Sequence, residues 1–258
     1  MTVSLLIATV LFAMQDSVLQ AESSLVLYDE SAIPPHYKPF KHFTFGNHSV
    51  TIKQNWAEQG VAGVVWDAAV VLCEYIVANP TLFLNKKVLE LGSGTGLSGI
   101  CAYMEGSRVT LTDRPDSLDV LKENVELNTK QCSNKHIEKD ALYKVASTNV
   151  PGCTPSNKLS SDSLSYIDCK VLDWAQRDNP LFDITWDVVI AADVIYIESS
   201  FEHLLQTMRT LKYSKMLFSC RLRYAKDHKF IRKARECFTI NLILYDKSRD
   251  IHIYSFSK

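Results

Sequence analysis

A glycine run places the strongest constraint on the fold of this chain. The apolar segment Val88–Leu91 leads into Gly92-Ser93-Gly94-Thr95-Gly96, with the acidic Glu90 inside the segment. A second apolar segment further on ends in Asp113. Glycines permit a sharp turn and close approach of a ligand to the backbone, and an acid after the next strand can reach ribose hydroxyls. The pattern predicts a pocket for an adenosine-containing cofactor.

The regions around the glycine run alternate between strand and helix patterns, which is typical of an α/β fold with a doubly wound, mostly parallel sheet. We predict seven strands in this sheet, the last two forming an antiparallel hairpin at its edge. The predicted strands are 88–91, 109–112, 169–172, 186–192, 215–220, 239–245 and 251–256. The predicted helices are 64–77, 96–105, 117–128, 201–211 and 227–237. A separate hairpin over 42–53 precedes them.

Two segments depart from this alternation. Residues 1–37 are weakly patterned and predict an N-terminal extension, followed by one domain over 38–258. Residues 129–166 are polar and rich in serine, and predict a flexible insertion. The apolar stretch 3–14 admits a secretory signal, but it has no basic residue before it. We therefore favour an apolar extension.

Composition narrows the class of protein. The formal net charge of −1 gives no global basic field that would gather nucleic acid or an anionic membrane. The seven cysteines include no C-x-x-C pair, so neither a zinc site nor any other metal site is expected. Several cysteines lie in apolar runs, which suits reduced thiols and a cytoplasmic protein, with the nucleus as a further compartment.

The glycine run fits two classes of cofactor. Gly94-x-Gly96-x-x-Gly99 followed by Asp113 also matches the dinucleotide fingerprint, so an NAD-dependent oxidoreductase is the alternative. Glu90 before the first glycine suits a cofactor with an α-ammonium group better than a pyrophosphate. A long segment precedes the first strand, and no catalytic set of a dehydrogenase follows. These features favour S-adenosylmethionine.

The flanking motifs resemble the seven-β-strand protein-lysine methyltransferases, and among them the enzymes that methylate a lysine of 70-kDa heat-shock chaperones. The resemblance covers residues 36–128 and 167–258. The motifs that carry it are Trp66-Asp67-Ala68-Ala69, Asp193-Val194-Ile195-Tyr196, Cys220-Arg221-Leu222-Arg223-Tyr224, Gln54-Asn55-Trp56, the stretch 60–66, Thr112-Asp113-Arg114, Leu204-Leu205-Gln206-Thr207 and Asp250-Ile251-His252-Ile253-Tyr254.

This resemblance implies S-adenosylmethionine as cofactor and a protein substrate, a 70-kDa heat-shock-type chaperone, with the enzyme acting as a monomer. The residues it places at the cofactor are Trp66, Glu90, Gly92, Ser93, Gly94, Asp113, Trp174 and Ala192. Asp193 and Tyr196 are the expected catalytic residues. Asp193 would orient the incoming ammonium, and the ring face of Tyr196 would hold the methylated cation.

Several points stay open at the level of sequence. Asp193 could instead cap the next helix. Arg221 and Arg223 suit substrate contact and structural ion pairing equally well. A methyltransferase for a small molecule or nucleic acid, and an inactive binding module with the same fold, remain alternatives to a protein-lysine methyltransferase.

Overall fold

The computed structural model describes residues 34–129 and 165–258. Contacts divide the chain into Met1–Pro35 and His36–Lys258, and the second unit holds all the elements below. The predicted extension and most of the predicted insertion lie outside the described residues.

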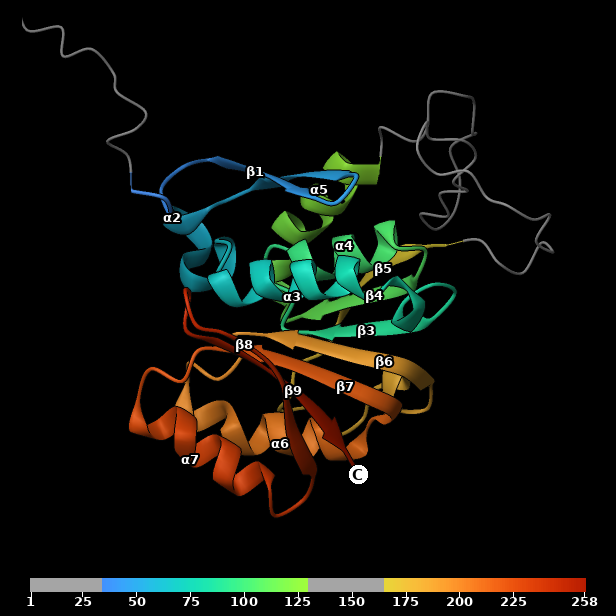
Figure 1. Ribbon diagram of the computed structural model, residues 1–258, viewed down its shortest axis with the longest axis vertical. Coiled ribbons are helices and arrows are strands. Elements are labelled where there is room, and N and C mark those ends of the chain that lie inside the picture. Colours follow the sequence, from blue (N-terminus) through green and yellow to red (C-terminus); the bar gives the residue numbers. More distant parts are fainter. Residues whose placement is uncertain (1–33, 130–164) are drawn as a thin grey trace, which may run out of the picture. The chain divides into compact units, whose positions relative to one another are not determined.

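Seven strands form the central sheet of the second unit (Figure 1). In spatial order they are β5 (Ile167–Val171), β4 (Arg108–Asp113), β3 (Lys87–Leu91), β6 (Thr185–Ala192), β7 (Lys212–Cys220), β9 (Ile251–Ser257) and β8 (Thr239–Asp246). Neighbours from β5 to β7 pair parallel, whereas β9 pairs antiparallel with both β7 and β8. The predicted sheet and its edge hairpin are confirmed.

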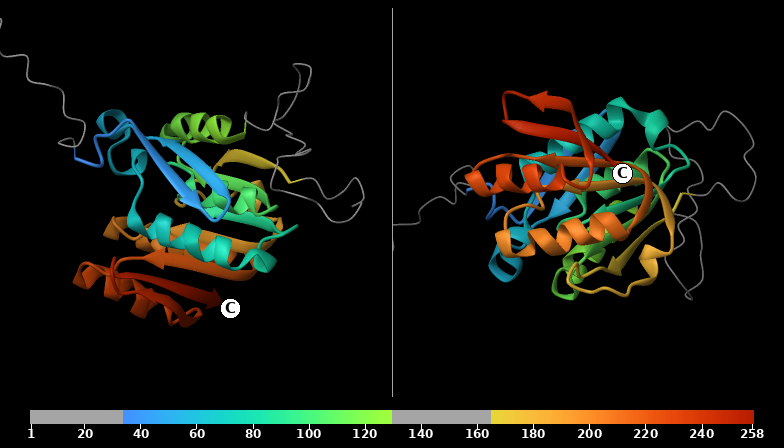
Figure 2. Two further views of the ribbon diagram at one scale, coloured as in Figure 1. Left: turned by 45° about the horizontal axis from the view of Figure 1, so that its top comes forward. Right: turned by 90° about the horizontal axis from the view of Figure 1, so that it is seen from below.

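Helices cover both faces of the sheet (Figures 1 and 2). One face carries α3 (Asp67–Ala78), α4 (Leu97–Met104) and α5 (Leu118–Thr129), and the other carries α6 (Phe201–Thr210) and α7 (Ala225–Ala234). Residues along β3 alternate between the faces: Val88 packs in the core beneath α3 to α5, and Leu89 packs in the core beneath α6 and α7. Because both faces are covered, the central strands are apolar almost throughout.

Short helical segments link these elements. They are α2 (Trp56–Gln59) and the 3-10 turns η2 (Gly60–Gly63), η3 (Pro80–Leu82), η4 (Pro115–Ser117), η6 (Pro180–Phe182) and η7 (Glu198–Ser200). No single helix within the described ranges is long and apolar enough to cross a membrane. The pair 56–63 and 67–78 passes by length and composition alone, with a bend of 54° between its two parts.

A two-stranded hairpin precedes the sheet, as predicted. β1 (Phe40–Phe45) and β2 (His48–Lys53) pair antiparallel. Two asparagines of α5 hold β2: Asn128 exchanges hydrogen bonds of 2.9 and 2.8 Å with the backbone of Thr51, and Asn124 exchanges bonds of 2.7 and 3.0 Å with that of Lys53. The Asn124 amide also donates to the carbonyl of Thr95, at 3.0 Å, and so joins the hairpin to the glycine loop.

The predicted helix boundaries differ from the structure at one place that matters for the site. The helix predicted from Val64 begins at Asp67, because the backbone is extended at both Val64 and Trp66. The side chain of Gln54 accepts the Val65 N–H at 2.9 Å, which satisfies this amide outside any helix. As a result, Trp66 stands at the helix start, beside the glycine loop.

Candidate active site

One cavity lies at the carboxyl ends of β3, β4 and β6, where the strand order reverses. Ligands of open α/β sheets bind at this point. All ten predicted site residues line the cavity: Trp66, Glu90, Gly92, Ser93, Gly94, Asp113, Trp174, Ala192, Asp193 and Tyr196. The cavity is open on one side, and its empty space of about 1060 Å³ includes space open to solvent.

The glycine loop forms a cradle that side chains would fill. Gly92 and Gly94 have φ of +61° and +52°, in the left-handed region that favours glycine. A β-carbon on Gly92 would lie 2.9 Å from Val194 Cγ1 and 3.1 Å from the ring of Trp174. One on Gly94 would lie 3.0 Å from the carbonyl oxygen of Ala62. Close packing of the loop against Val194, Trp174 and Ala62 therefore requires glycine at both positions.

Glu90 is 2% exposed and lies under the loop, where its Oε2 accepts the Gly99 N–H at 3.1 Å. Burial raises the pKa of this carboxyl to about 8, against the opposing effect of the hydrogen bond from Gly99. A cationic group arriving in the cavity would favour the charged form. Glu90 thus suits the α-ammonium group of S-adenosylmethionine, whereas a pyrophosphate would bring no cation to stabilise its charged form.

Asp113 ends β4 and faces the loop. Its Oδ2 accepts the Gly94 N–H and its Oδ1 the Arg114 N–H, both at 2.8 Å. Burial raises the pKa of Asp113, and these two hydrogen bonds oppose that rise. Each carboxylate oxygen has a second lone pair, so both oxygens remain able to accept from a ribose diol.

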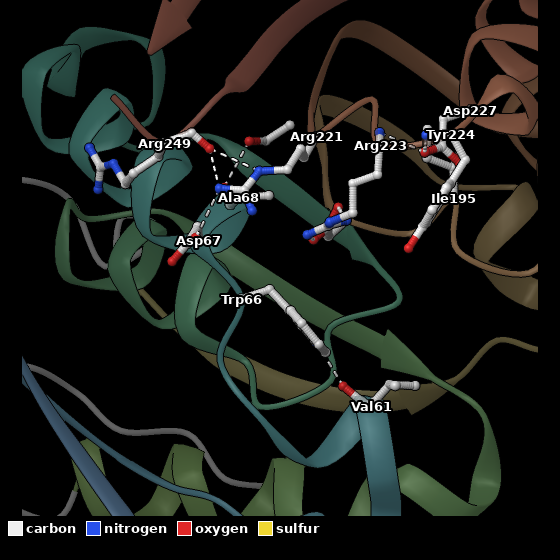
Figure 3. A network of polar contacts seen from close by, with 12 residues as sticks. Val61, Trp66, Asp67, Ala68, Ile195, Arg221, Arg223, Tyr224, Asp227 and Arg249 are labelled. Atoms are coloured by element: carbon white, nitrogen blue, oxygen red, sulfur yellow. Dashed lines mark hydrogen bonds and ion pairs between the residues drawn. The ribbon is translucent and has the colours of Figure 1, made fainter. Parts of the chain in front are cut away.

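Two tryptophans and Ala192 complete the predicted cofactor walls. Trp66 is 38% exposed, and its indole N–H donates to the carbonyl of Val61 at 2.8 Å (Figure 3). Trp174 packs beside Gly92 and against the core beneath α6 and α7. Ala192 ends β6 and has no bulk to obstruct the cavity. These placements bring the three residues to one cavity, as predicted.

Asp193 directly follows β6, with φ of +55°. Its N–H donates to the carbonyl of Ser219 at 2.8 Å, and its carboxylate forms a two-pronged ion pair with Arg223, at 3.1 and 2.9 Å. It is not a helix cap, because η7 begins after Ile197 and α6 after Ser200. A strained backbone at the end of a strand is common at active sites.

Tyr196 lines the same cavity with 45% of its surface exposed. Partial burial is the main cause that raises the pKa of Tyr196 above its usual value, and nearby Asp113 adds to the effect. The phenol is therefore neutral at physiological pH, and its ring can form one wall of a channel toward Asp193.

The two arginines after β7 have different roles in the structure. Arg221 forms an ion pair of 3.2 Å with Asp67, and its Nε donates to the Arg249 carbonyl at 2.9 Å (Figure 3). Arg223 binds Asp193 instead. The structural ion pairing that sequence left open is observed for both. Tyr224 is 63% exposed.

Some residues of the cavity were missed by sequence reasoning. They are Val61, Ala62, Val64, Ala69, Thr95, Ser98, Arg114, Leu172, Asp173, Ala175, Val194, Ile197, Ser200 and His203. Val61, Ala62, Val64, Arg114 and Val194 lie in motifs that carried the resemblance, which is the one signal that pointed to them. Within the described ranges, no group of three His, Cys, Asp or Glu side chains is arranged to hold a metal.

The comparisons with known proteins agree with this site. A family model described as lysine methyltransferase matches residues 44–150 and 142–237. The chain is 37% identical over 240 residues to the protein N-lysine methyltransferase METTL21A of Mus musculus, covering 91% of this chain and 96% of that protein. It is 31% identical to the EEF1A lysine methyltransferase 3 of Mus musculus, with 84% and 82% covered.

Among solved structures, the magnesium protoporphyrin IX methyltransferase of Synechocystis shares the fold, with a TM-score of 0.50 at 14% identity, covering 78% of this chain and 85% of that one. The fold and the cavity define an S-adenosylmethionine-dependent methyltransferase. The chain belongs to the lysine methyltransferase family. The predicted protein-lysine methyltransferase is confirmed, and the NAD-dependent alternative is set aside.

Proposed function

We propose that this enzyme methylates a lysine of a 70-kDa heat-shock-type chaperone. The support is the resemblance over 36–128 and 167–258, together with the cavity that gathers all ten expected residues. The chain is less similar to the EEF1A lysine methyltransferase than to the METTL21A proteins, which makes elongation factor 1A the less favoured substrate.

The cavity residues divide into a cofactor end and a substrate end. We assign Glu90 to the α-ammonium group, Asp113 to the ribose and Trp174 to the adenine. Gly92, Ser93 and Gly94 supply backbone contacts, and Trp66 and Ala192 form walls. The cavity fits S-adenosylmethionine, because Glu90 offers a counter-charge to its ammonium and the Asp113 carboxylate offers acceptors to its ribose.

When bound, S-adenosylmethionine supplies a methyl group activated by a positively charged sulfur. The lysine must present a neutral amine, although a free lysine has a pKa of about 10.4. In this proposal Asp193 orients the side chain and Tyr196 walls its path. The amine proton leaves to water, the nitrogen lone pair forms the new N–C bond, and the electrons of the broken S–C bond stay on sulfur.

The test uses labelled S-adenosylmethionine with an intact 70-kDa heat-shock chaperone and, in parallel, with elongation factor 1A. We expect label on the chaperone, and mass spectrometry should locate it on one lysine. Lys→Arg at that position should abolish labelling. Label that survives this substitution, or that appears on elongation factor 1A alone, would refute the chaperone-lysine assignment.

We further propose a monomer in the cytoplasm. The free thiols Cys73, Cys101, Cys169, Cys220 and Cys237 support a reducing compartment. Sedimentation should give one species of monomer mass, and fractionated cells should hold the protein in the cytosol. A dimer, or recovery from secreted medium, would contradict these proposals.

A further inference from the structure

Arg223 is held both at its guanidinium and at its backbone. Its guanidinium makes two hydrogen bonds to Asp193, and it lies 5.8 Å from the centre of the Trp66 ring. Its backbone N–H donates to Asp227 Oδ2 at 2.9 Å. Asp227 is only 2% exposed and also accepts the Tyr224 N–H, which fixes the start of α7. Arg223 is therefore preorganised against the catalytic carboxylate.

This arrangement bears on a conflict in the chemistry. A carboxylate that attracts a lysine ammonium also stabilises it in the protonated form, which has no lone pair for attack. The Asp193 side chain is only 7% exposed, so solvent screens its charge poorly. An arginine is always charged and matches a carboxylate with two parallel hydrogen bonds. It can cancel the charge of Asp193 while it fixes the orientation of the carboxylate.

We propose that Arg223 is a positioning residue for methyl transfer, which holds Asp193 and cancels its charge so that the lysine amine reacts in its neutral form. This inference rests on the proposed lysine methylation. Arg223 acts through Asp193, because it does not itself line the cavity. Two lone pairs of Asp193 remain for the amine after Arg223 has taken one on each oxygen.

The other charged groups near the pair have partners of their own. Asp67 at the start of α3 pairs with Arg221 at 3.2 Å, and Asp227 on α7 pairs with Lys226 at 2.7 Å. Burial raises the pKa of the Cys220 thiol, so it remains neutral. Among the described residues, Arg223 is the cation that forms an ion pair with Asp193.

The titratable groups that line the cavity also have interactions of their own, apart from the pair of Arg223 and Asp193. Arg114 pairs with Asp116 at 3.1 Å, Asp113 is bound by two backbone N–H groups, and Glu90 lies buried at the far, cofactor end. Asp173, whose Oδ1 accepts the Ala175 N–H at 2.9 Å, Tyr196 and His203 complete the titratable lining. A substitution of Arg223 therefore removes the positive charge beside Asp193 and leaves the other ion pairs of the site in place.

The experiment records kcat against pH, from pH 6.5 to 10, on the intact chaperone. Arg223→Met removes the charge and keeps much of the length. We expect its profile to move to higher pH by about one unit, so that the rate at pH 7.5 falls about tenfold and recovers at alkaline pH. Arg223→Lys keeps the charge, so its kcat should depend on pH as that of the wild type does. Arg232→Met is the matched control, because Arg232 is exposed on α7.

Three further measurements distinguish the proposed role of Arg223 from a simple loss of structure. Binding of S-adenosylhomocysteine, measured by calorimetry, should be unchanged in Arg223→Met. A chaperone with aminoethylcysteine at the target position carries a less basic amine, and it should restore the rate of Arg223→Met at pH 7.5. The double variant Asp193→Asn with Arg223→Met should return the profile to its wild-type pH at a lower rate.

The outcomes separate the inference from the function on which it rests. A rate that falls equally at every pH, or a profile that does not move, overturns the role of Arg223 and leaves lysine methylation intact. If Arg223→Met does not fold, a shifted profile in Arg223→Lys overturns it. Absence of lysine methylation by the wild-type enzyme at every pH refutes the proposed function, and the inference with it.

Discussion

The carboxylate of Asp113 accepts the backbone N–H of Gly94 at 2.8 Å. This bond joins the end of β4 to the turn that follows β3, so the acid expected at the ribose also shapes the glycine loop. The two parts of the cofactor site are therefore coupled before any ligand binds.

Replacement of Asp113 by alanine removes both the ribose acceptor and the support of the loop. We expect the affinity for S-adenosylhomocysteine to fall by ten- to a hundredfold, since a hydrogen bond to a charged group contributes about 1.5–3 kcal/mol. Isothermal titration calorimetry measures this loss. Asp116→Ala is the control, because Asp116 is exposed and pairs with Arg114. An equal loss of affinity in both variants would show that Asp113 has no specific role in cofactor binding.

A β-carbon on Gly92 would strike Val194 and the ring of Trp174. We expect Gly92→Ala to cost about 1–2 kcal/mol of stability through its backbone and to weaken cofactor binding through the displaced ring. Gly60 also has a positive φ, but a β-carbon there would meet nothing within 4 Å. Gly60→Ala should therefore lose stability without losing affinity. Thermal melts and calorimetry test the pair, and a Gly92→Ala protein of normal affinity would contradict the cradle.

The raised pKa of Glu90 makes stability depend on pH. Between about pH 4.5 and 8 the folded protein holds a proton on Glu90 that the unfolded chain has released, so this group stabilises less as the pH rises. Glu90→Gln removes the effect. As the pH rises, the free energy of unfolding of the variant should increase relative to that of the wild type, by at most about 1.4 kcal/mol per pH unit.

Urea denaturation at pH 5, 6, 7 and 8 provides this comparison. Glu123→Gln repeats the substitution at a half-exposed surface side chain and controls for the change itself. A constant difference between wild type and Glu90→Gln across the four pH values would be incompatible with a buried, protonated carboxyl.

Tyr196 is expected to act through its ring and not through its hydroxyl. Because the pKa of Tyr196 is raised, the phenol carries no charge to use as a base near neutral pH. Tyr196→Phe should keep the methylation rate within about threefold, whereas Tyr196→Ala should lose about tenfold, as expected for a cation–π contact of 1–2 kcal/mol. Steady-state kinetics on the chaperone test this prediction. A phenylalanine variant as slow as the alanine variant would show that the hydroxyl group is needed.

The fold was predictable because its signals are local. Apolar runs of strand length, the glycines and the helix patterns each occupy a few neighbouring residues, and parallel strands bring their ends to one edge. That geometry gathered Gly92, Asp113 and Asp193, which lie far apart in sequence.

The features that could not be predicted from the sequence depend on contacts between residues far apart in the chain. The bond of Arg223 to Asp193 joins two loops across 30 residues, and no periodicity encodes it. The same holds for the start of α3. Its apolar pattern extends back to Val64, but the Gln54 side chain captures the Val65 amide and keeps that segment extended.

The two asparagines that hold β2 have a consequence for association. Exposed strand edges pair readily with other chains, and proteins protect them with charges, bulges or covering elements. Here Asn124 and Asn128 present amide groups that copy the hydrogen bonding of a neighbouring strand. Side-chain amides do not titrate, so the hydrogen bonds that the two asparagines make to β2 are independent of pH. The two amides cover that edge of the hairpin against pairing with other chains, and the Asn124 amide that donates to Lys53 also donates to the Thr95 carbonyl in the glycine loop.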